Sequence, residues 1–233
     1  MRFVRRQSML LKLNHLVARF GVGVFIALIF ACALFVLAGM LTKDAWGQQT
    51  SIPRAAQPHK AALIKAAHYE FGLDAPVALL AAQIHAESHW RPDVTSALGA
   101  QGLAQFMPAT ARWLPEVAPH TGKPEPYSPG WSIRAMCAYD NWILKQISAE
   151  NSFERWAMTL SAYNGGLGWL KKDKRKALAE GFDSQRWFNH IENVNAGRKK
   201  SAFDENRGYP RRILLTLMPV YEQAGWGRGV VNE

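Results

Sequence analysis

The sequence predicts a mainly α-helical domain that follows an apolar N-terminal helix. Two observations support this fold class. Residues 21–41 contain no charged side chain, and residues 59–233 consist of helix-like segments joined by loops rich in Gly and Pro. No segment shows the sustained alternation of apolar and polar residues that a strand would produce.

The N-terminal segment, residues 1–47, predicts where the chain is located. Several basic residues precede the uncharged run at residues 21–41, which is 21 residues long. At about 1.5 Å per residue, such a helix can cross a hydrocarbon core of about 30 Å. This length favours an anchor in the inner membrane over a signal peptide, and the basic flank predicts a periplasmic C-terminal part. Cleavage stays an alternative, because Ala45 and Gly47 are small residues at positions that a signal peptidase reads.

A linker and a single domain are expected after this segment. Residues 48–58 contain two prolines among small and polar neighbours, which is typical of a linker, so residues 59–233 should form the domain. Outside residues 1–47 the chain carries 22 basic and 17 acidic residues. This charge suits an anionic polymer, and peptidoglycan and nucleic acid both qualify.

The helices of the first half are delimited by capping residues and glycines. The first is predicted to begin at His59 and to stop at Gly72. Asp74 is a favourable N-cap, with Pro76 in the first turn, for a second helix that runs to about Ser88.

The middle of the chain reads mainly as loops. A loop rich in Gly, Ala and Ser covers residues 91–102, and a short helix follows from Pro108 to about Leu114. Residues 115–130 contain five prolines and two glycines, which predicts a long loop.

The second half is again helical, because apolar residues recur at i, i+4 and i+7. The expected elements are a helix over residues 132–149, a helix capped by Ser152 and ended by Gly165, a basic helix ending at Gly181, and a last helix from Pro210 to about Gln223. The basic run at residues 171–176 would favour a nucleic-acid partner, but such a run is usually a solvated helix face. We therefore expect no nucleic acid.

Glu87 is the candidate catalytic residue on the second helix. Leu80, Ile84 and Glu87 lie on one stripe, so a carboxyl group is aligned with apolar side chains near a helix C-terminus. Apolar surroundings and the negative end of the helix dipole both disfavour the ionised form. A glutamic acid that keeps its proton near neutral pH can protonate a leaving group. The alternative is a peripheral glutamate whose carboxylate reaches water.

His85 and His89 flank Glu87 and raise the question of a zinc site. In the zinc-protease motif the Glu directly follows the first His, whereas here Glu87 is two residues from each. At about 100° per residue, the histidines lie about 200° from Glu87 around the helix. We therefore expect no metal and no cofactor, and two surface histidines.

Three blocks of sequence resemble motifs of the soluble lytic transglycosylases, in that family's order. They are Ala86-Glu87-Ser88-His89-Trp90 with Ser96 and Gly99-Ala100-Gln101-Gly102-Leu103-Ala104-Gln105-Phe106-Met107-Pro108-Ala109-Thr110-Ala111, then Leu160-Ser161-Ala162-Tyr163-Asn164-Gly165-Gly166, then Glu205-Asn206-Arg207-Gly208-Tyr209. The chain departs from the family pattern at Ala104, Asn206 and Pro210, where Met, Thr and Val are usual.

The resemblance implies a lysozyme-like helical fold with a groove-shaped active site. It implies cleavage of the β-1,4 bond between N-acetylmuramic acid and N-acetylglucosamine in peptidoglycan strands, leaving a 1,6-anhydromuramyl end. Glu87 aligns with the family's catalytic acid, which acts first as acid and then as base. The substrate-binding residues that it implies are Ser96, Gln105, Met107, Tyr163, Asn164, Tyr209 and Glu205, the last aligned with a late acid.

Two other functions remain open at this point. A goose-type lysozyme would share the fold but hydrolyse the bond, and a non-catalytic peptidoglycan-binding scaffold would bind strands without cutting them. For an enzyme of this family, we expect either local wall opening for a secretion or conjugation complex, or general wall turnover.

Overall fold

Helix α3 (Val77–Ser88) is the centre of the fold in the computed structural model, which describes residues 51–231. Its side chains are buried on almost every side, including Leu79, Leu80 and Ile84 at 0% exposure. A helix that is apolar all round belongs in a core, because no face of it gains from contact with water. The last turn of this buried helix carries Glu87.

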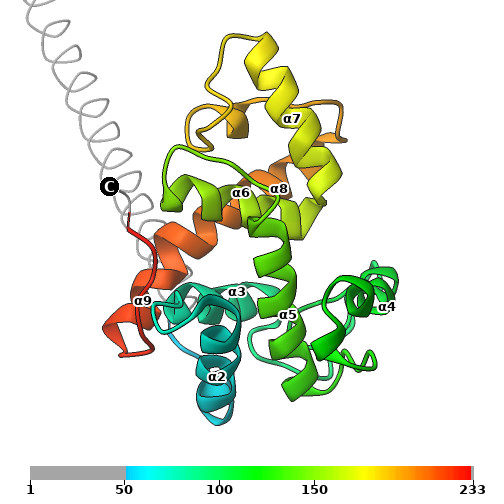
Figure 1. Ribbon diagram of the computed structural model, residues 1–233, viewed down its shortest axis with the longest axis vertical. Coiled ribbons are helices and arrows are strands. Elements are labelled where there is room, and N and C mark those ends of the chain that lie inside the picture. Colours follow the sequence, from blue (N-terminus) through cyan, green and yellow to red (C-terminus); the bar gives the residue numbers. More distant parts are fainter. Residues whose placement is uncertain (1–50, 232–233) are drawn as a thin grey trace, which may run out of the picture. The chain divides into compact units, whose positions relative to one another are not determined.

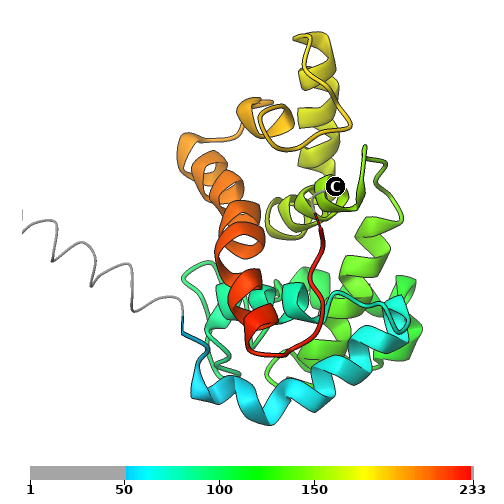
Figure 2. The ribbon, with the colours of Figure 1, turned by 90° about the vertical axis from the view of Figure 1, so that its left-hand side faces the viewer.

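Figure 1 shows α2, α4 and α5 in the lower part of the view with α3, and α6, α7 and α8 in the upper part. The bounds of the other helices are η1 (Arg54–His59), α2 (Lys60–Phe71), α4 (Pro108–Val117), η2 (Pro119–Thr121), α5 (Pro129–Leu144), α6 (Ser152–Gly165), α7 (Leu167–Ala179), η3 (Ile191–Asn193), α8 (Lys200–Arg211), η4 (Arg212–Leu217) and α9 (Met218–Gln223). Helix α2 packs on α5, α6 packs on α5, α7 and α8, and α3 packs on η4 and α9. Figures 1 and 2 show α2 and α7 at opposite ends of this arrangement.

The mainly α-helical class predicted from the sequence is confirmed. Within residues 51–231, extended pairing is limited to the isolated bridges Thr95–Gln101 and Gln101–Phe106. The predicted membrane anchor at residues 21–41 lies outside the described residues. Among the residues that are described, no helix has the length and apolar character needed to cross a membrane.

Two predicted helix caps are wrong. Helix α3 begins at Val77 after the non-helical Pro76, and Asp74 instead accepts a hydrogen bond from Arg228 at 2.9 Å. Helix α6 is capped by Asn151, whose side chain accepts a hydrogen bond from the Glu154 N–H at 2.9 Å. Asn and Ser are comparable N-caps, so the backbone conformation decides between Asn151 and Ser152. Asn151 is extended, as an N-cap requires, whereas Ser152 is already helical.

The prediction that the last helix begins at Pro210 is also wrong. Helix α8 begins ten residues earlier, at Lys200, and Pro210 lies inside it. Proline cannot donate the hydrogen bond that a regular helix requires at that point, and its ring crowds the preceding turn. The helix does not stop but widens, just after Pro210, into the π-helical stretch η4 and then continues as α9. Glu205 and Tyr209 therefore lie on a helix rather than in a loop.

The loop between α3 and α4 is fixed by close contact with the chain near Pro126. Gly102 has a φ of +74°, and a Cβ atom built on it would lie 1.8 Å from the Pro126 carbonyl oxygen. The Thr95 and Tyr127 hydroxyl groups, 2.7 Å apart, join the same two segments. Gly102 is thus required both for its backbone conformation and for the space that its missing side chain leaves.

Replacing Gly102 with Ala should lower the free energy of unfolding by about 3 kcal/mol, because strain at a positive φ adds to a steric clash. Chemical denaturation measures this loss. The matched control is Gly99→Ala, because Gly99 also has a positive φ but nothing lies within 4 Å of its Cβ position. That control should lose only about 1 kcal/mol, and equal losses in the two variants would contradict the clash.

Candidate active site

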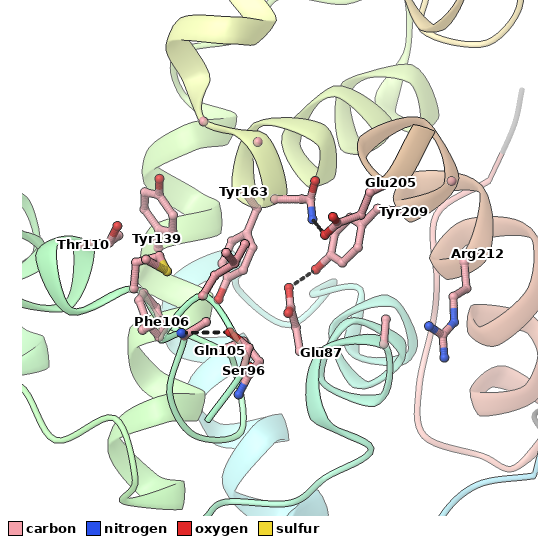
Figure 3. Close-up of a pocket in the computed structure, with 18 of the residues that line it drawn as sticks. Glu87, Ser96, Gln105, Phe106, Thr110, Tyr139, Tyr163, Glu205, Tyr209 and Arg212 are labelled. Atoms are coloured by element: carbon pink, nitrogen blue, oxygen red, sulfur yellow. Dashed lines mark hydrogen bonds between the residues drawn. The ribbon is translucent and has the colours of Figure 1, made fainter. Parts of the chain in front are cut away.

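A pocket of about 810 Å³ opens beside the C-terminal end of α3. The structure brings all eight predicted site residues to its lining: Glu87, Ser96, Gln105, Met107, Tyr163, Asn164, Glu205 and Tyr209. Side chains that were not predicted also line it, among them Leu98, Thr110, Tyr139 and Arg212. Figure 3 shows Glu87 between Gln105 and Ser96 on one side and Arg212 on the other.

The direction of Glu87 follows from the way α3 ends. His89 and Trp90 both have positive φ values, 53° and 63°, which turn the chain sharply away from the helix axis. The Trp90 ring is completely buried, and its indole N–H donates to the Tyr221 hydroxyl at 2.6 Å. This anchor fixes the turn directly after Glu87, so the carboxyl group is held at the pocket by the core.

The pKa of the Glu87 carboxyl is raised to about 7, chiefly because the surrounding protein removes water from it. The Tyr209 hydroxyl donates a hydrogen bond to Glu87 Oε1, which works in the opposite direction by stabilising the ionised form. Smaller effects come from the Glu205 carboxylate, which raises the pKa, and from the Arg212 guanidinium, which lowers it. Glu87 is therefore about half protonated near neutral pH.

Two of the three tyrosines that line the pocket, Tyr163 and Tyr209, are held as neutral phenols. Burial raises the pKa values of Tyr163 and Tyr209 well above the ordinary value, and the nearby Glu87 carboxylate adds to both shifts. The Tyr163 hydroxyl donates to the Ala104 carbonyl at 2.7 Å, which ties helix α6 to the loop before α4. Tyr209 is thus the phenol that contacts Glu87 directly, whereas Tyr163 hydrogen-bonds to the loop before α4.

The loop residues Ser96 and Gln105 hydrogen-bond within their own loop. The Ser96 hydroxyl accepts from the Ala100 N–H at 3.0 Å, and no hydrogen bond from Ser96 to Glu87 is found. The Gln105 amide nitrogen donates to the Gly102 carbonyl at 2.8 Å. Met107, whose side chain is 44% exposed, and Leu98 at 83% provide apolar surface along the pocket.

A buried polar network positions the α8 side of the pocket. The Asn206 side chain donates to Asn164 Oδ1 at 2.9 Å, and Asn164 in turn donates to Glu205 at 3.4 Å. Arg207 donates to Asn206 at 2.6 Å and to the buried Asp173 at 2.9 Å. Asn206, at a position where the resembled family usually has Thr, therefore joins the second and third sequence blocks.

The prediction of two surface histidines is wrong for His85. Its ring is 2% exposed and lies 3.2 Å from the Tyr221 hydroxyl, because α3 is packed on all its faces. Burial, together with the nearby His89 and Arg212, lowers the pKa of His85 to about 4. His89 is partly exposed, because it lies just after the last turn of α3. Within residues 51–231, no group of three His, Cys, Asp or Glu side chains that could hold a metal ion is found.

Arg212 was missed because Pro210 was interpreted as the start of a helix. Once α8 is known to extend through Tyr209, Arg212 falls three residues further along a continuous helix, on the face that carries Tyr209. If the helix had been continued through Pro210 in the prediction, the three-residue spacing from Tyr209 would have indicated that Arg212 lies on the same face.

Comparison with known proteins places Glu87 and the pocket residues up to Gly166 in a recognised domain. The family model described as "Transglycosylase SLT domain" matches residues 62–185, slightly more than half of the 233 residues. The chain is 32% identical over 136 residues to a membrane-bound lytic murein transglycosylase F of Haemophilus influenzae (strain PittGG). It is 34% identical over 117 residues to the protein of the same name from Pasteurella multocida (strain Pm70).

These relatives are much longer than the region they share with this chain. The matches cover 57% and 50% of this chain but only 27% and 22% of the two relatives. Among solved structures, the 70-kDa soluble lytic transglycosylase in complex with bulgecin A is similar, with a TM-score of 0.50 and 24% identity. The likeness covers 73% of this chain and 25% of that one, and it shows that the helical fold is shared.

Replacement of Tyr209 and of Glu205 should shift the pKa of Glu87 in opposite directions. Tyr209→Phe removes a hydrogen bond to the carboxylate and should raise the pKa above the value of about 7, whereas Glu205→Gln removes a like charge and should lower it. Carbon-13 NMR titration of side-chain carboxyl groups measures both shifts, with the Glu87 signal assigned by its loss in Glu87→Gln. A Glu87 signal that titrates near 4.5 in the unsubstituted chain would contradict the desolvated environment.

Proposed function

The chain belongs to the family defined by the transglycosylase SLT domain, and from this premise we propose that it is a peptidoglycan lytic transglycosylase. The substrate of the proposed reaction is the β-1,4 bond between N-acetylmuramic acid and N-acetylglucosamine. One observation carries the proposal: a glutamic acid with a pKa of about 7 lies in a pocket beside a phenol that hydrogen-bonds to it. The names of the relatives, which are lytic murein transglycosylases, support the same activity.

In the first step, protonated Glu87 gives its proton to the glycosidic oxygen as the bond to the muramyl anomeric carbon breaks. The leaving strand departs with a free hydroxyl group on N-acetylglucosamine. The positive charge that develops on the muramyl ring is stabilised by the ring oxygen and by the substrate's own N-acetyl group. The Tyr209 hydroxyl stabilises the Glu87 carboxylate that remains.

In the second step, the Glu87 carboxylate takes the proton from the C6 hydroxyl of the same muramyl sugar. The C6 oxygen then bonds to the anomeric carbon and closes the 1,6-anhydro ring. Attack within one sugar gains from proximity, so no activated water is required. Glu87 ends the cycle protonated, and no atom is gained or lost overall.

Hydrolysis is the second candidate reaction, and Glu205 is the observation that favours it. Ordinary glycosidases use two carboxyl groups, and Glu205 provides a second one in the same pocket. We propose an electrostatic role for Glu205 instead, which its hydrogen bond from Asn164 and its effect on the Glu87 pKa support. Product masses separate the two reactions, because a hydrolysed end is heavier than an anhydro end by one water molecule.

The proposed location is the periplasmic face of the inner membrane. The uncharged residues 21–41 support an anchor, and the relatives are named membrane-bound. In this position the enzyme would open the wall locally for a secretion or conjugation complex, or serve wall turnover. The groove residues Gln105 and Tyr163 would contact the acetamido groups of the strand.

Glu87→Gln should lower the release of anhydromuropeptides by at least about a thousandfold, because no other group supplies the proton in both steps. Digestion of purified sacculi by the full-length chain, followed by mass spectrometry of the products, measures this loss. The thermal unfolding midpoint should not fall, since glutamine keeps the shape of the side chain. Anhydro products at an undiminished rate in this variant would exclude Glu87 as the catalytic acid.

The pH dependence of kcat/KM should show the need for the protonated carboxyl. Because the pKa of Glu87 is raised to about 7, activity should be constant more than about one pH unit below this value and fall about tenfold per pH unit more than about one unit above it. A turbidity assay on sacculi over this range measures the alkaline limb. A rate that stays constant to two units above neutrality is the contrary result.

A further inference from the structure

Two polar side chains are buried in the core beside the pocket, and the proposed reaction uses neither of them. Gln83 lies on α3 four residues before Glu87, and therefore on the same face one turn earlier. Asp140 lies on α5 directly after Tyr139, which lines the pocket (Figure 3). Gln83 and Asp140 are both 0% exposed. The Gln83 Nε2 group donates to Asp140 Oδ1 at 3.3 Å, so the pair joins α3 to α5 one turn before Glu87.

Each side chain of this pair has a second oxygen atom that lacks a donor. Within residues 51–231, Gln83 Oε1 and Asp140 Oδ2 are both buried and without a hydrogen-bond partner. An ionised Asp140 cannot correct this, because carboxylate and amide oxygens are both acceptors. A single proton on Oδ2 can, since the resulting hydroxyl group would donate to Gln83 Oε1. An amide and a carboxylic acid joined in this way form a ring closed by two hydrogen bonds, and neither oxygen is then left unpaired.

The titratable groups that interact with Asp140 do not favour its ionised form. They are an acid, a thiol and three phenols: Glu87 on α3, Cys137 and Tyr139 on α5, Tyr163 on α6 and Tyr209 on α8. Burial raises the pKa of Asp140 well above its ordinary value, and the Glu87 carboxylate adds to the rise. The hydrogen bond from Gln83 works in the opposite direction.

No cation among the described residues holds Asp140 as a carboxylate, because it takes part in no ion pair there. The cations of the surrounding elements are exposed or paired elsewhere. Lys65 of α2, Arg112 of α4, and Arg134 and Lys145 of α5 are exposed, Arg155 of α6 donates to the Leu144 carbonyl, and His120 of η2 pairs with Glu70. A buried carboxylate without a partner is costly, so such a group takes up a proton instead.

We propose that Asp140 is a positioning residue for Glu87, which keeps its own proton and closes a ring of two hydrogen bonds with Gln83. The ring fixes the last turns of α3 against α5, and with them the Glu87 side chain. It also leaves no second negative charge beside a carboxyl group that has to act as a base in the second step. The ring rests on the contacts of the pair alone, whereas its role toward Glu87 rests on the proposed function.

An ionised Asp140 that accepts a hydrogen bond from Gln83 alone is the competing state. As a like charge it would raise the pKa of Glu87, and its replacement by a neutral side chain would lower that pKa. A protonated Asp140 can be replaced by Asn without this effect, because the Asn amide group can donate to Gln83 Oε1 and accept from Gln83 Nε2 in the same places. One isosteric substitution therefore distinguishes the two states.

The first measurement is carbon-13 NMR of the full-length chain labelled at its aspartate side-chain carboxyl groups. At a pH of about 6 an ordinary aspartate is ionised, because its pKa is about 4. The Asp140 signal, assigned by its loss in Asp140→Asn, should still be that of a protonated carboxyl group. It should remain in the matched control Asp93→Asn, since Asp93 is exposed and does not line the pocket. An Asp140 signal in the ionised range at this pH would overturn the ring.

The second measurement is the pH profile of kcat and of KM on uncrosslinked glycan strands. Asp140→Asn should keep the rate and the position of the alkaline limb, and so should Asp93→Asn. Asp140→Leu has a side chain of similar size that cannot form the ring. It should lower kcat about tenfold with KM unchanged, because a misplaced catalytic group slows the chemical step. Gln83→Met removes the ring from the α3 side and covers the case in which Asp140→Leu does not fold, which its thermal unfolding midpoint reveals.

Two kinetic results overturn the positioning role while the proposed function stands: an alkaline limb that moves to lower pH in Asp140→Asn, or an unchanged kcat in a folded variant that lacks the ring. Absence of anhydro products from the unsubstituted chain would overturn the proposed function, and the role toward Glu87 with it. The NMR signal of Asp140 decides the ring independently of either result.

Discussion

The site depends on one constraint, the exclusion of water from the Glu87 carboxyl at the end of a buried helix. Exclusion from water alone would suppress ionisation too far for the second step of the proposed reaction, in which Glu87 acts as a base. The hydrogen bond from Tyr209 offsets part of that effect, and the pKa settles at about 7. A carboxyl group poised in this way is able to lose a proton and regain it within one reaction cycle. Without the desolvation Glu87 would be mainly a carboxylate, the form that the second step of the proposed reaction requires. Without the Tyr209 hydrogen bond it would be mainly protonated, the form that the first step requires.

The rest of the fold holds these two residues together although they are 122 residues apart in sequence. Trp90 anchors the turn after Glu87 in the core, and α8 is attached to α6 and α7 through Asn206, Arg207 and the buried Asp173. Asp173 also pairs with Arg198 at 3.1 Å. Because a buried charge that loses its partner costs about 3–5 kcal/mol, this network can hold the Tyr209 side of the pocket in a single position.

Much of the site could be predicted from local sequence. The alignment of Glu87 with Leu80 and Ile84 follows from helical periodicity, and the three sequence blocks contain the eight predicted site residues, all of which line the pocket. Features that depend on tertiary packing could not be read in this way. The burial of His85 follows from α9 and η4 packing on α3, and nothing in the neighbourhood of His85 in the sequence indicates it. The same holds for the choice of Asn151 over Ser152 as a cap.

Arg212 shows how one local rule can hide a residue that lines the pocket. Proline usually begins or breaks a helix, and the rule gave a boundary in the middle of what is a continuous element. The structure accommodates Pro210 by widening the next turn, and this keeps Glu205, Tyr209 and Arg212 on one face. A pocket wall with opposite charges at its two ends, which no single motif describes, is the result.

The source of the oxygen atom that bonds to the muramyl anomeric carbon separates the proposed reaction from hydrolysis. Peptidoglycan is digested with the full-length chain in water labelled with oxygen-18, and the new muramyl ends are analysed by mass spectrometry. If the C6 hydroxyl of the sugar is the nucleophile, the ends are anhydro and carry no label. Reducing ends that contain one labelled oxygen would show that water attacks, and would contradict the account.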